Sequence, residues 1–157
     1  MGGMLHVPRR LACSSTLGPV LLISFASCSV PDLGLRDGRL TSCPGSPNCV
    51  SSLAQDDGHR VDGFPLVKSV DETRAGLEEI IAAMPRTVLM KKEGHYLRFQ
   101  FTTLIFRFKD DVEFHIVPAD RLVHVRSSSR VGYYDFGVNR ARVDAIRRAY
   151  DSWLANK

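Results

Sequence analysis

The chain lacks the short motifs that would fix a chemistry at once. Its 157 residues contain no P-loop, no dinucleotide-binding glycine pattern and no haem-attachment motif. They also lack the G-x-S-x-G turn that exposes the nucleophile of an α/β-hydrolase. No apolar run reaches the roughly 20 residues that a membrane-spanning helix needs. Composition, patterning and residue clusters therefore carry the interpretation.

Acidic residues are missing from the start of the chain, where the first one is Asp32. Arg9 and Arg10 precede a mostly apolar stretch over residues 11–26, which ends in small residues. A basic start, a short apolar run and small residues in this order are typical of a secretory signal. We expect an exported protein, and the alternative is a soluble protein with an apolar N-terminus.

The tetrapeptide Phe25-Ala26-Ser27-Cys28 closes this stretch and resembles the lipobox of bacterial lipoproteins. The resemblance implies that residues 1–27 are a signal peptide and that Cys28 is lipidated and becomes the mature N-terminus. Lipid anchors through its buried methylenes, at about 0.8 kcal/mol each. Ser29, where an aspartate would resemble an inner-membrane retention signal, favours the outer membrane of a Gram-negative envelope, with the domain facing the periplasm. A plain cleaved signal, with Cys28 incidental, is the alternative.

A large excess of positive charge is absent from the mature chain. Removing residues 1–27 takes away two of the 21 basic residues and none of the 17 acidic ones, so the net charge falls from +4 to +2. A nucleic-acid partner loses its main support, because such proteins carry a marked basic excess.

Only four cysteines are present. With Cys13 in the signal and Cys28 carrying lipid, Cys43 and Cys49 remain, and in an oxidising compartment such a pair indicates a disulfide. The turn-forming residues 44–48 allow a short loop to close. A zinc pair is the alternative, but it needs about four ligands and no second cysteine pair exists. We expect no metal and no cofactor.

Three parts are predicted along the chain: the signal peptide 1–27, a flexible tether 28–41 without periodicity, and a single domain over residues 42–157. Ser69 and Glu72 form a capping box for a first helix that Pro85 ends. Period-two alternation predicts strands over the ranges 87–90, 96–101, 106–117 and 122–128, and a helical period returns over 138–156.

This order predicts an α+β domain: an antiparallel four-stranded meander with two helices packed on its apolar face, in the order helix, four strands, helix. The longest strand places its apolar residues on one face, namely Phe106, Phe108, Val112, Phe114 and Ile116. Asp110 breaks the alternation, which suggests a bulge or an inward-pointing acid. The other face of the sheet is expected to be polar and free.

Three stretches stand out in order along the chain: CPGSPNCVSSL at 43–53, DDVEF at 110–114 and RSSSRVGYYDFGVNRAR at 126–142. Together they resemble the domain-of-unknown-function 1499 (DUF1499) family. The resemblance implies an envelope protein, often lipid-anchored or membrane-attached, with no established activity. Lys109 departs from the family's apolar residue before the two aspartates, and Asp144 replaces its usual glutamate.

A cluster of basic and polar residues provides a candidate ligand site. Two long guanidinium groups on one strand face can converge on a phosphate or carboxylate, and free amides at a helix start also favour anions. The residues of this candidate anion pocket are Arg126, Ser128, Arg130, Asn139 and Arg140.

The same arginines have a structural interpretation. Opposite charges on neighbouring strands stabilise a sheet, and the acidic residues available as partners are Asp110, Asp111, Glu113 and Asp135. Asp135 and Asn139 would then fix the glycine-containing loop 131–138. The two interpretations make different demands on geometry, because a ligand pocket requires the five candidate residues to converge.

Two weaker constellations complete the candidates. Asp111, Glu113 and His115 alternate on one strand face, but a metal needs ligands within about 2–2.5 Å, and side chains along a straight strand spread apart. A hydrolase of the Ser–His–acid type would use Ser128 with His124 and Asp135, yet the serines are more easily satisfied by backbone hydrogen bonds.

The sequence favours a non-catalytic envelope lipoprotein that binds an anionic small molecule, such as a lipid head group, or a protein partner of unknown identity. The second class is an enzyme that acts on an envelope component. The third is a purely structural envelope protein.

Overall fold

The computed structural model describes residues 33–157, so the predicted signal peptide and Cys28 lie outside the described residues. The helices are α1 (Val70–Ala82) and α2 (Val138–Ala155), with a short 3-10 turn η1 (Pro118–Asp120). The strands are β1 (Leu35–Arg36), β2 (Arg39–Leu40), β3 (Cys49–Ser51), β4 (Phe64–Pro65), β5 (Thr87–Glu93), β6 (Tyr96–Thr102), β7 (Lys109–Val117) and β8 (Leu122–Ser129).

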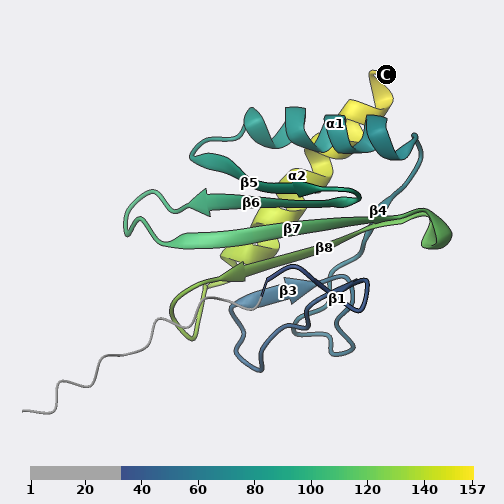
Figure 1. Cartoon of the computed structure of the whole chain (residues 1–157). Coiled ribbons are helices and arrows are strands. Elements are labelled where there is room, and N and C mark those ends of the chain that lie inside the picture. The colour runs from purple at the N-terminus through teal and green to yellow at the C-terminus, as the bar shows by residue number, and fades with distance from the viewer. Residues whose placement is uncertain (1–32) are drawn as a thin grey trace, which may run out of the picture. The chain divides into compact units, whose positions relative to one another are not determined.

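The four long strands form the predicted antiparallel meander, but the sheet has six strands. Its order is β3-β8-β7-β6-β5, and β4 also pairs with β8 (Figure 1). The prediction of a four-stranded sheet in the order helix, four strands, helix was therefore wrong in number and order. The added strands have two or three residues and come from turn-rich sequence, so neither is long enough to show an alternating pattern.

Helix α1 begins as its sequence predicts. The Ser69 side chain accepts a hydrogen bond from the Glu72 amide, and the Glu72 carboxylate accepts one from the Ser69 amide. This reciprocal pair satisfies two amides that a helix start leaves without partners. The last helical residue is Ala82, and Pro85 lies three residues beyond it.

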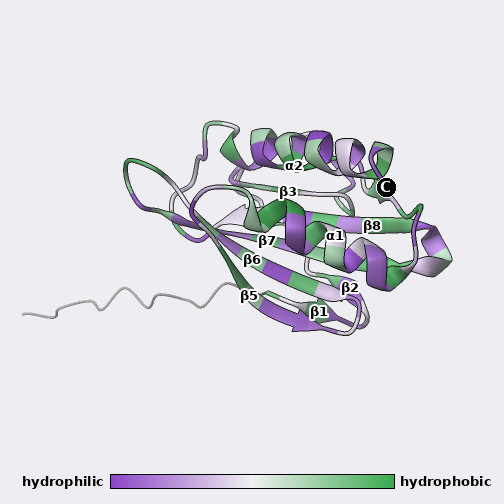
Figure 2. Ribbon diagram, turned by 90° about the horizontal axis from the view of Figure 1, so that it is seen from above, coloured by the Kyte–Doolittle hydropathy of each residue, from purple (hydrophilic) through white to green (hydrophobic). Residues whose placement is uncertain are grey.

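Both helices cover one face of the sheet, and their apolar residues meet those of the strands in a single core. Figure 2 shows the helices on one side of the sheet and the strands β1 and β2 on the other. The buried core residues of the long strands are Leu97, Phe99, Phe101, Val112, Phe114, Ile116, Val123 and Val125. The α2 stripe adds Val143, Ile146 and Tyr150.

The third long strand begins later than the alternation suggests. Strand β7 starts at Lys109, so Phe106 and Phe108 belong to the loop after β6 and are exposed. Asp110 lies on the helix side of the sheet and is 2% exposed, which confirms the inward-pointing acid and excludes a bulge at that position in the β6–β7 pairing.

The opposite face of the sheet is polar, as predicted, but it is not free. Residues 33–41, assigned to a flexible tether from the sequence, contain the β1–β2 hairpin and bury Leu40. The Gly34 amide donates to the Glu113 carboxylate at 2.6 Å, and Glu113 is fully buried. The folded part of the chain therefore includes residues before Ser42.

Candidate functional site

A groove lies between two loops at one end of the sheet, and we call it the two-loop groove. One wall is loop 103–108, between β6 and β7, and the other is loop 130–137, between β8 and α2. The groove has a volume of about 510 Å³. Its first wall presents Leu104, Ile105, Phe106 and Phe108, and its second presents Val131, Tyr134 and Phe136.

The apolar side chains of these walls are highly exposed to solvent. Phe136 is 95% exposed, Ile105 79%, Phe106 72% and Leu104 68%. Single exposed apolar residues are common on soluble proteins, but contiguous apolar patches mark sites of interaction. The two loops therefore form the clearest candidate site in the described part of the chain.

Loop 103–108 is closed by two hydrogen bonds between its ends. The Thr103 amide donates to the Phe108 carbonyl and the Phe108 amide donates to the Thr103 hydroxyl, both at 2.9 Å. Arg107 takes a positive φ of 56° to complete the turn. The rings of Phe106 and Phe108 stack with centroids 5.4 Å apart. These contacts direct the apolar side chains outward.

Loop 130–137 is fixed by Asp135. Its carboxylate accepts hydrogen bonds from the amides of Gly137 and Asn139, both at 2.9 Å. An acid in this position satisfies free amides at the start of α2 and opposes the positive end of the helix dipole. Gly132 and Gly137 take positive φ angles of 87° and 77°, and Phe136 between them takes one of 54°.

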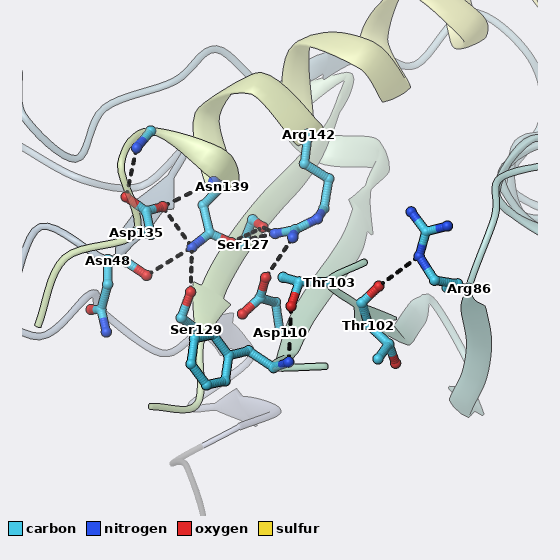
Figure 3. A network of polar contacts seen from close by, with 12 residues as sticks. Asn48, Arg86, Thr102, Thr103, Asp110, Ser127, Ser129, Asp135, Asn139 and Arg142 are labelled. Carbon is cyan, nitrogen blue, oxygen red and sulfur yellow. Dashed lines mark hydrogen bonds and ion pairs between the residues drawn. The ribbon is translucent and has the colours of Figure 1, made fainter. Parts of the chain in front are cut away.

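A buried amide network lies beneath the groove (Figure 3). The Asn139 Nδ2 group donates to the Asn48 carbonyl, the Ser129 hydroxyl and the Asp135 carboxylate at 2.8–3.0 Å. The Ser127 hydroxyl donates to Asn139 Oδ1 at 2.6 Å. Because Asn139 is fully buried, losing any partner would leave a desolvated polar group. The network thus joins the β3 segment, β8 and α2.

Arg142 links this network to the floor of the groove. Its Nη1 donates to Asn139 Oδ1 and its Nη2 donates to Asp110 Oδ2 (Figure 3). Its guanidinium also lies over the Phe101 ring, 5.1 Å from the centroid. The inward-pointing Asp110 is therefore neutralised by an α2 arginine that the sequence did not single out.

The Cys43–Cys49 disulfide is present, as the cysteine spacing predicted. Its loop holds Asn48, whose side chain donates to the Gly132 carbonyl and whose carbonyl accepts from Asn139 and from the Ser129 amide. The disulfide loop is thus attached directly to loop 130–137, the second wall of the groove.

Two arginines of the predicted anion pocket are paired with buried acids. Arg126 Nη1 lies 2.8 Å from Glu113 Oε2, and Arg130 makes a bidentate pair with Asp111 at 2.7 and 2.8 Å. The hydrogen bond with Asp111 raises the pKa of Arg130. Tyr96 donates to Glu113 at 2.7 Å, and burial next to that carboxylate raises the pKa of Tyr96, which keeps it protonated.

The other three candidate residues lie elsewhere. Ser128 is on the outer sheet face in register with Asp111, whereas Asn139 is in the amide network on the helix side. Arg140 donates to the carbonyls of Arg60 and Gly58, at 2.7 and 2.9 Å. The five residues therefore do not converge on one pocket, and the arrangement follows the structural interpretation in which arginines pair with acids.

The hydrolase constellation that the sequence offered as a weaker alternative does not form. His124 contacts Ser52 and Asp120 rather than Ser128 and Asp135. Across residues 33–157, no group of three or more His, Cys, Asp or Glu side chains is arranged to hold a metal ion. Within the same range, no helix has the length and apolarity to cross a membrane.

Sequence reasoning missed the two-loop groove, although a signal was available. The run TLIFRF at 103–108 and the aromatic residues at 133, 134 and 136 are apolar stretches next to residues with positive φ. The sequence predicts that residues 106–108 of the first run begin a strand, because their alternation continues that of β7. The two stretches are far apart in sequence, so only the fold brings them together.

Fold and site define the chain as an α+β domain with an exposed apolar groove above a buried polar network. The family model described as protein of unknown function (DUF1499) matches residues 39–150, and the chain belongs to this family. Comparisons with curated proteins and with solved structures give no match.

Proposed function

We propose that this protein is a lipid-anchored protein of the bacterial envelope whose domain docks on the bilayer through the two-loop groove. The role of the groove is non-catalytic binding, and its occupant is the acyl region of the membrane that holds the anchor. The observation that carries the proposal is the exposure of large apolar side chains on two adjacent loops.

Insertion of the loop tips into a bilayer would remove this surface from water. Burial of one large apolar side chain contributes about 1.5–3 kcal/mol. Phe106, Ile105 and Leu104 protrude from one loop and Phe136 from the other, so even partial insertion gives several favourable contacts. Tyr133 and Tyr134, both exposed, suit the interface, because tyrosine has an apolar ring and a polar tip.

The lipid anchor would bring the groove to the membrane. Gly34 is held at the middle of β7 by Glu113, and Cys28 precedes Gly34 by six residues. An extended chain spans at most about 3.6 Å per residue, so six residues give an anchor a maximum reach of roughly 20 Å. The groove end of β7, at Lys109, is about 13 Å from Glu113 at 3.3 Å per residue. Anchor and groove can thus reach one bilayer surface.

Basic residues beside the groove favour an anionic surface. Arg107 lies in the first loop and Lys109 directly follows it, and both are exposed. A basic side chain near an anionic membrane contributes about 1 kcal/mol. This retains the expected anionic head group as a partner, but it assigns the contact to Arg107 and Lys109 and not to the paired Arg126 and Arg130.

Vesicle co-sedimentation tests the proposal. A chain that begins at residue 29 keeps every described element and carries no lipid, so its binding reports on the domain alone. Replacing Phe106 and Phe136 together by serine should weaken binding at least tenfold, since about 1.5 kcal/mol or more is lost per side chain. Val67→Ser is the matched control, because Val67 is 65% exposed and does not line the groove.

Vesicle composition separates the two contributions. Replacing Arg107 and Lys109 by glutamine should weaken binding to anionic vesicles and leave binding to zwitterionic vesicles unchanged. Equal sedimentation of the wild-type chain and the Phe106/Phe136 variant would reject bilayer docking. The anchor is tested separately by the mass of the full-length product from bacterial envelopes, which should begin at an acylated Cys28 and lose the acyl mass in Cys28→Ser.

A further inference from the structure

Ser52, His124 and Asp120 form a continuous chain of hydrogen bonds at the other end of β8 from the groove. Ser52 Oγ lies 3.2 Å from His124 Nδ1, and His124 Nε2 lies 2.9 Å from Asp120 Oδ2. The fold assembles these residues from the end of β3, from β8 and from the 3-10 turn η1 before it. No motif in the sequence marks them as a set.

The surrounding hydrogen bonds suit one arrangement of the protons. The Val125 amide donates to Ser52 Oγ at 3.0 Å, which leaves the serine hydroxyl able to donate to His124 Nδ1. A neutral His124 that donates from Nε2 to the Asp120 carboxylate has Nδ1 as the matching acceptor. Nucleophile, base and orienting acid therefore stand in the order that activates a serine.

The three residues differ in solvent exposure. His124 is 8% exposed, which restricts its ring to the position set by its two partners. Ser52 is partly exposed and Asp120 is exposed. A partly exposed serine hydrogen-bonded to a fixed imidazole is the arrangement that a nucleophile requires.

We infer that Ser52 is an activated nucleophile toward electrophilic carboxylic esters, with His124 as its general base and Asp120 as the positioning residue for His124. In the first step, the Oγ–C bond forms while the Ser52 proton moves to His124 Nδ1, and the ester C–O bond breaks as the leaving alcohol takes that proton. Water then attacks the acyl-serine, with the proton again passing through His124, and releases the carboxylic acid.

The amides after the serine limit the chemistry. The Ser52 amide donates to the Val125 carbonyl, the Leu53 amide to Ser51 Oγ and the Ala54 amide to the Ser51 carbonyl. None is left to stabilise an oxyanion, an interaction worth about 10²–10³-fold in rate. The substrate class is therefore an ester with a good leaving group, and acylation followed by slow release is expected.

The test uses the chain from residue 29, a p-nitrophenyl ester and a fluorophosphonate, with intact-mass and peptide mass spectrometry. We expect one adduct per chain, on Ser52, and no adduct in Ser52→Ala. General-base assistance contributes about 10²–10⁴-fold, so His124→Gln should slow adduct formation by at least a hundredfold. An adduct on another residue, or equal rates in the wild type and His124→Gln, would overturn the inference.

Asp120 supplies a variant that separates catalysis from folding. Because its side chain is exposed, Asp120→Asn should leave the unfolding midpoint unchanged while slowing adduct formation about tenfold or more. Asp120→Glu, which keeps the carboxylate, should restore part of the rate. A purely structural role for the three residues predicts no difference between the Asn and Glu variants, and that result would also reject the inference.

Discussion

The guanidinium of Arg126 pairs with the Glu113 carboxylate across β8 and β7, with Nη1 and Oε2 2.8 Å apart and both side chains buried. Glu113 accepts two further hydrogen bonds, from the Tyr96 hydroxyl and from the Gly34 amide. Through the Gly34 contact this carboxylate fastens the hairpin at residues 33–41 to the sheet.

Removing one partner of this pair should destabilise the fold strongly. Arg126→Gln leaves a buried carboxylate without its counter-charge, and we expect the free energy of unfolding to fall by about 3–5 kcal/mol. Urea denaturation measures the change, with the exposed Arg148→Gln as control, expected within about 0.5 kcal/mol of wild type. Unchanged stability together with lost affinity for an anion would instead assign Arg126 to a ligand site.

The sequence predicted the helix-side half of the domain well, because that half follows simple periods. Leu97, Phe99 and Phe101 alternate in β6 and are buried together, and the Ser69 capping box starts α1 at the expected residue. Alternation identifies which face of a strand is apolar. It cannot show whether a further layer covers the polar face, which is why the burial of Glu113 was not foreseen.

The candidate site was harder to predict, for a different physical reason. Phe106 and Phe108 continue the period of β7, so the pattern alone gives no sign that the strand begins only at Lys109. The arginines at 126 and 130 were recognised as functional or structural, but their partners depend on strand register, which places Glu113 opposite Arg126 and Asp111 opposite Ser128. Register is a property of the assembled sheet.

Gly76 is required for the packing of α1 against α2. A Cβ at this position would collide with the Trp153 ring. Gly76→Ala should therefore destabilise the domain by about 1–3 kcal/mol, despite the higher helix propensity of alanine. Trp153 is the only tryptophan, so its fluorescence should report the displaced ring. Gly45→Ala is the control, since its Cβ would meet open space, and an equal loss in both variants would refute the packing argument.

Two histidines should make the free energy of unfolding depend on pH in opposite directions. The hydrogen bond with Asp56, helped by the Ser46 carbonyl, raises the pKa of His59 above 6.5. The contribution of His59 to the free energy of unfolding is thus fully present below about pH 6.5 and is lost as the pH rises through the raised pKa. Burial, with His124 and His95 nearby, lowers the pKa of His115. That contribution is present above pH 6.5 and is lost as the pH falls through the lowered pKa.

Single variants separate these effects. In urea titrations between about pH 5 and pH 8, His59→Gln should remove a decline in stability toward high pH, and His115→Gln should remove a decline toward low pH. The His59 effect should be small, because its partner Asp56 is largely exposed and the pair is screened by solvent. A pH profile unaltered by either change would show that neither histidine is linked to folding.

The Cys43–Cys49 disulfide should support both the fold and the groove. Replacing both cysteines by serine opens a short loop, and the free energy of unfolding should fall by about 2 kcal/mol. The loop also holds Asn48 against Gly132 and Asn139, so vesicle binding should weaken as loop 130–137 loses its support. Asn48→Ala with the disulfide intact should weaken vesicle binding similarly while leaving the disulfide's contribution to stability in place. If the serine variant binds vesicles as the wild type does, the disulfide stabilises the fold without shaping the groove.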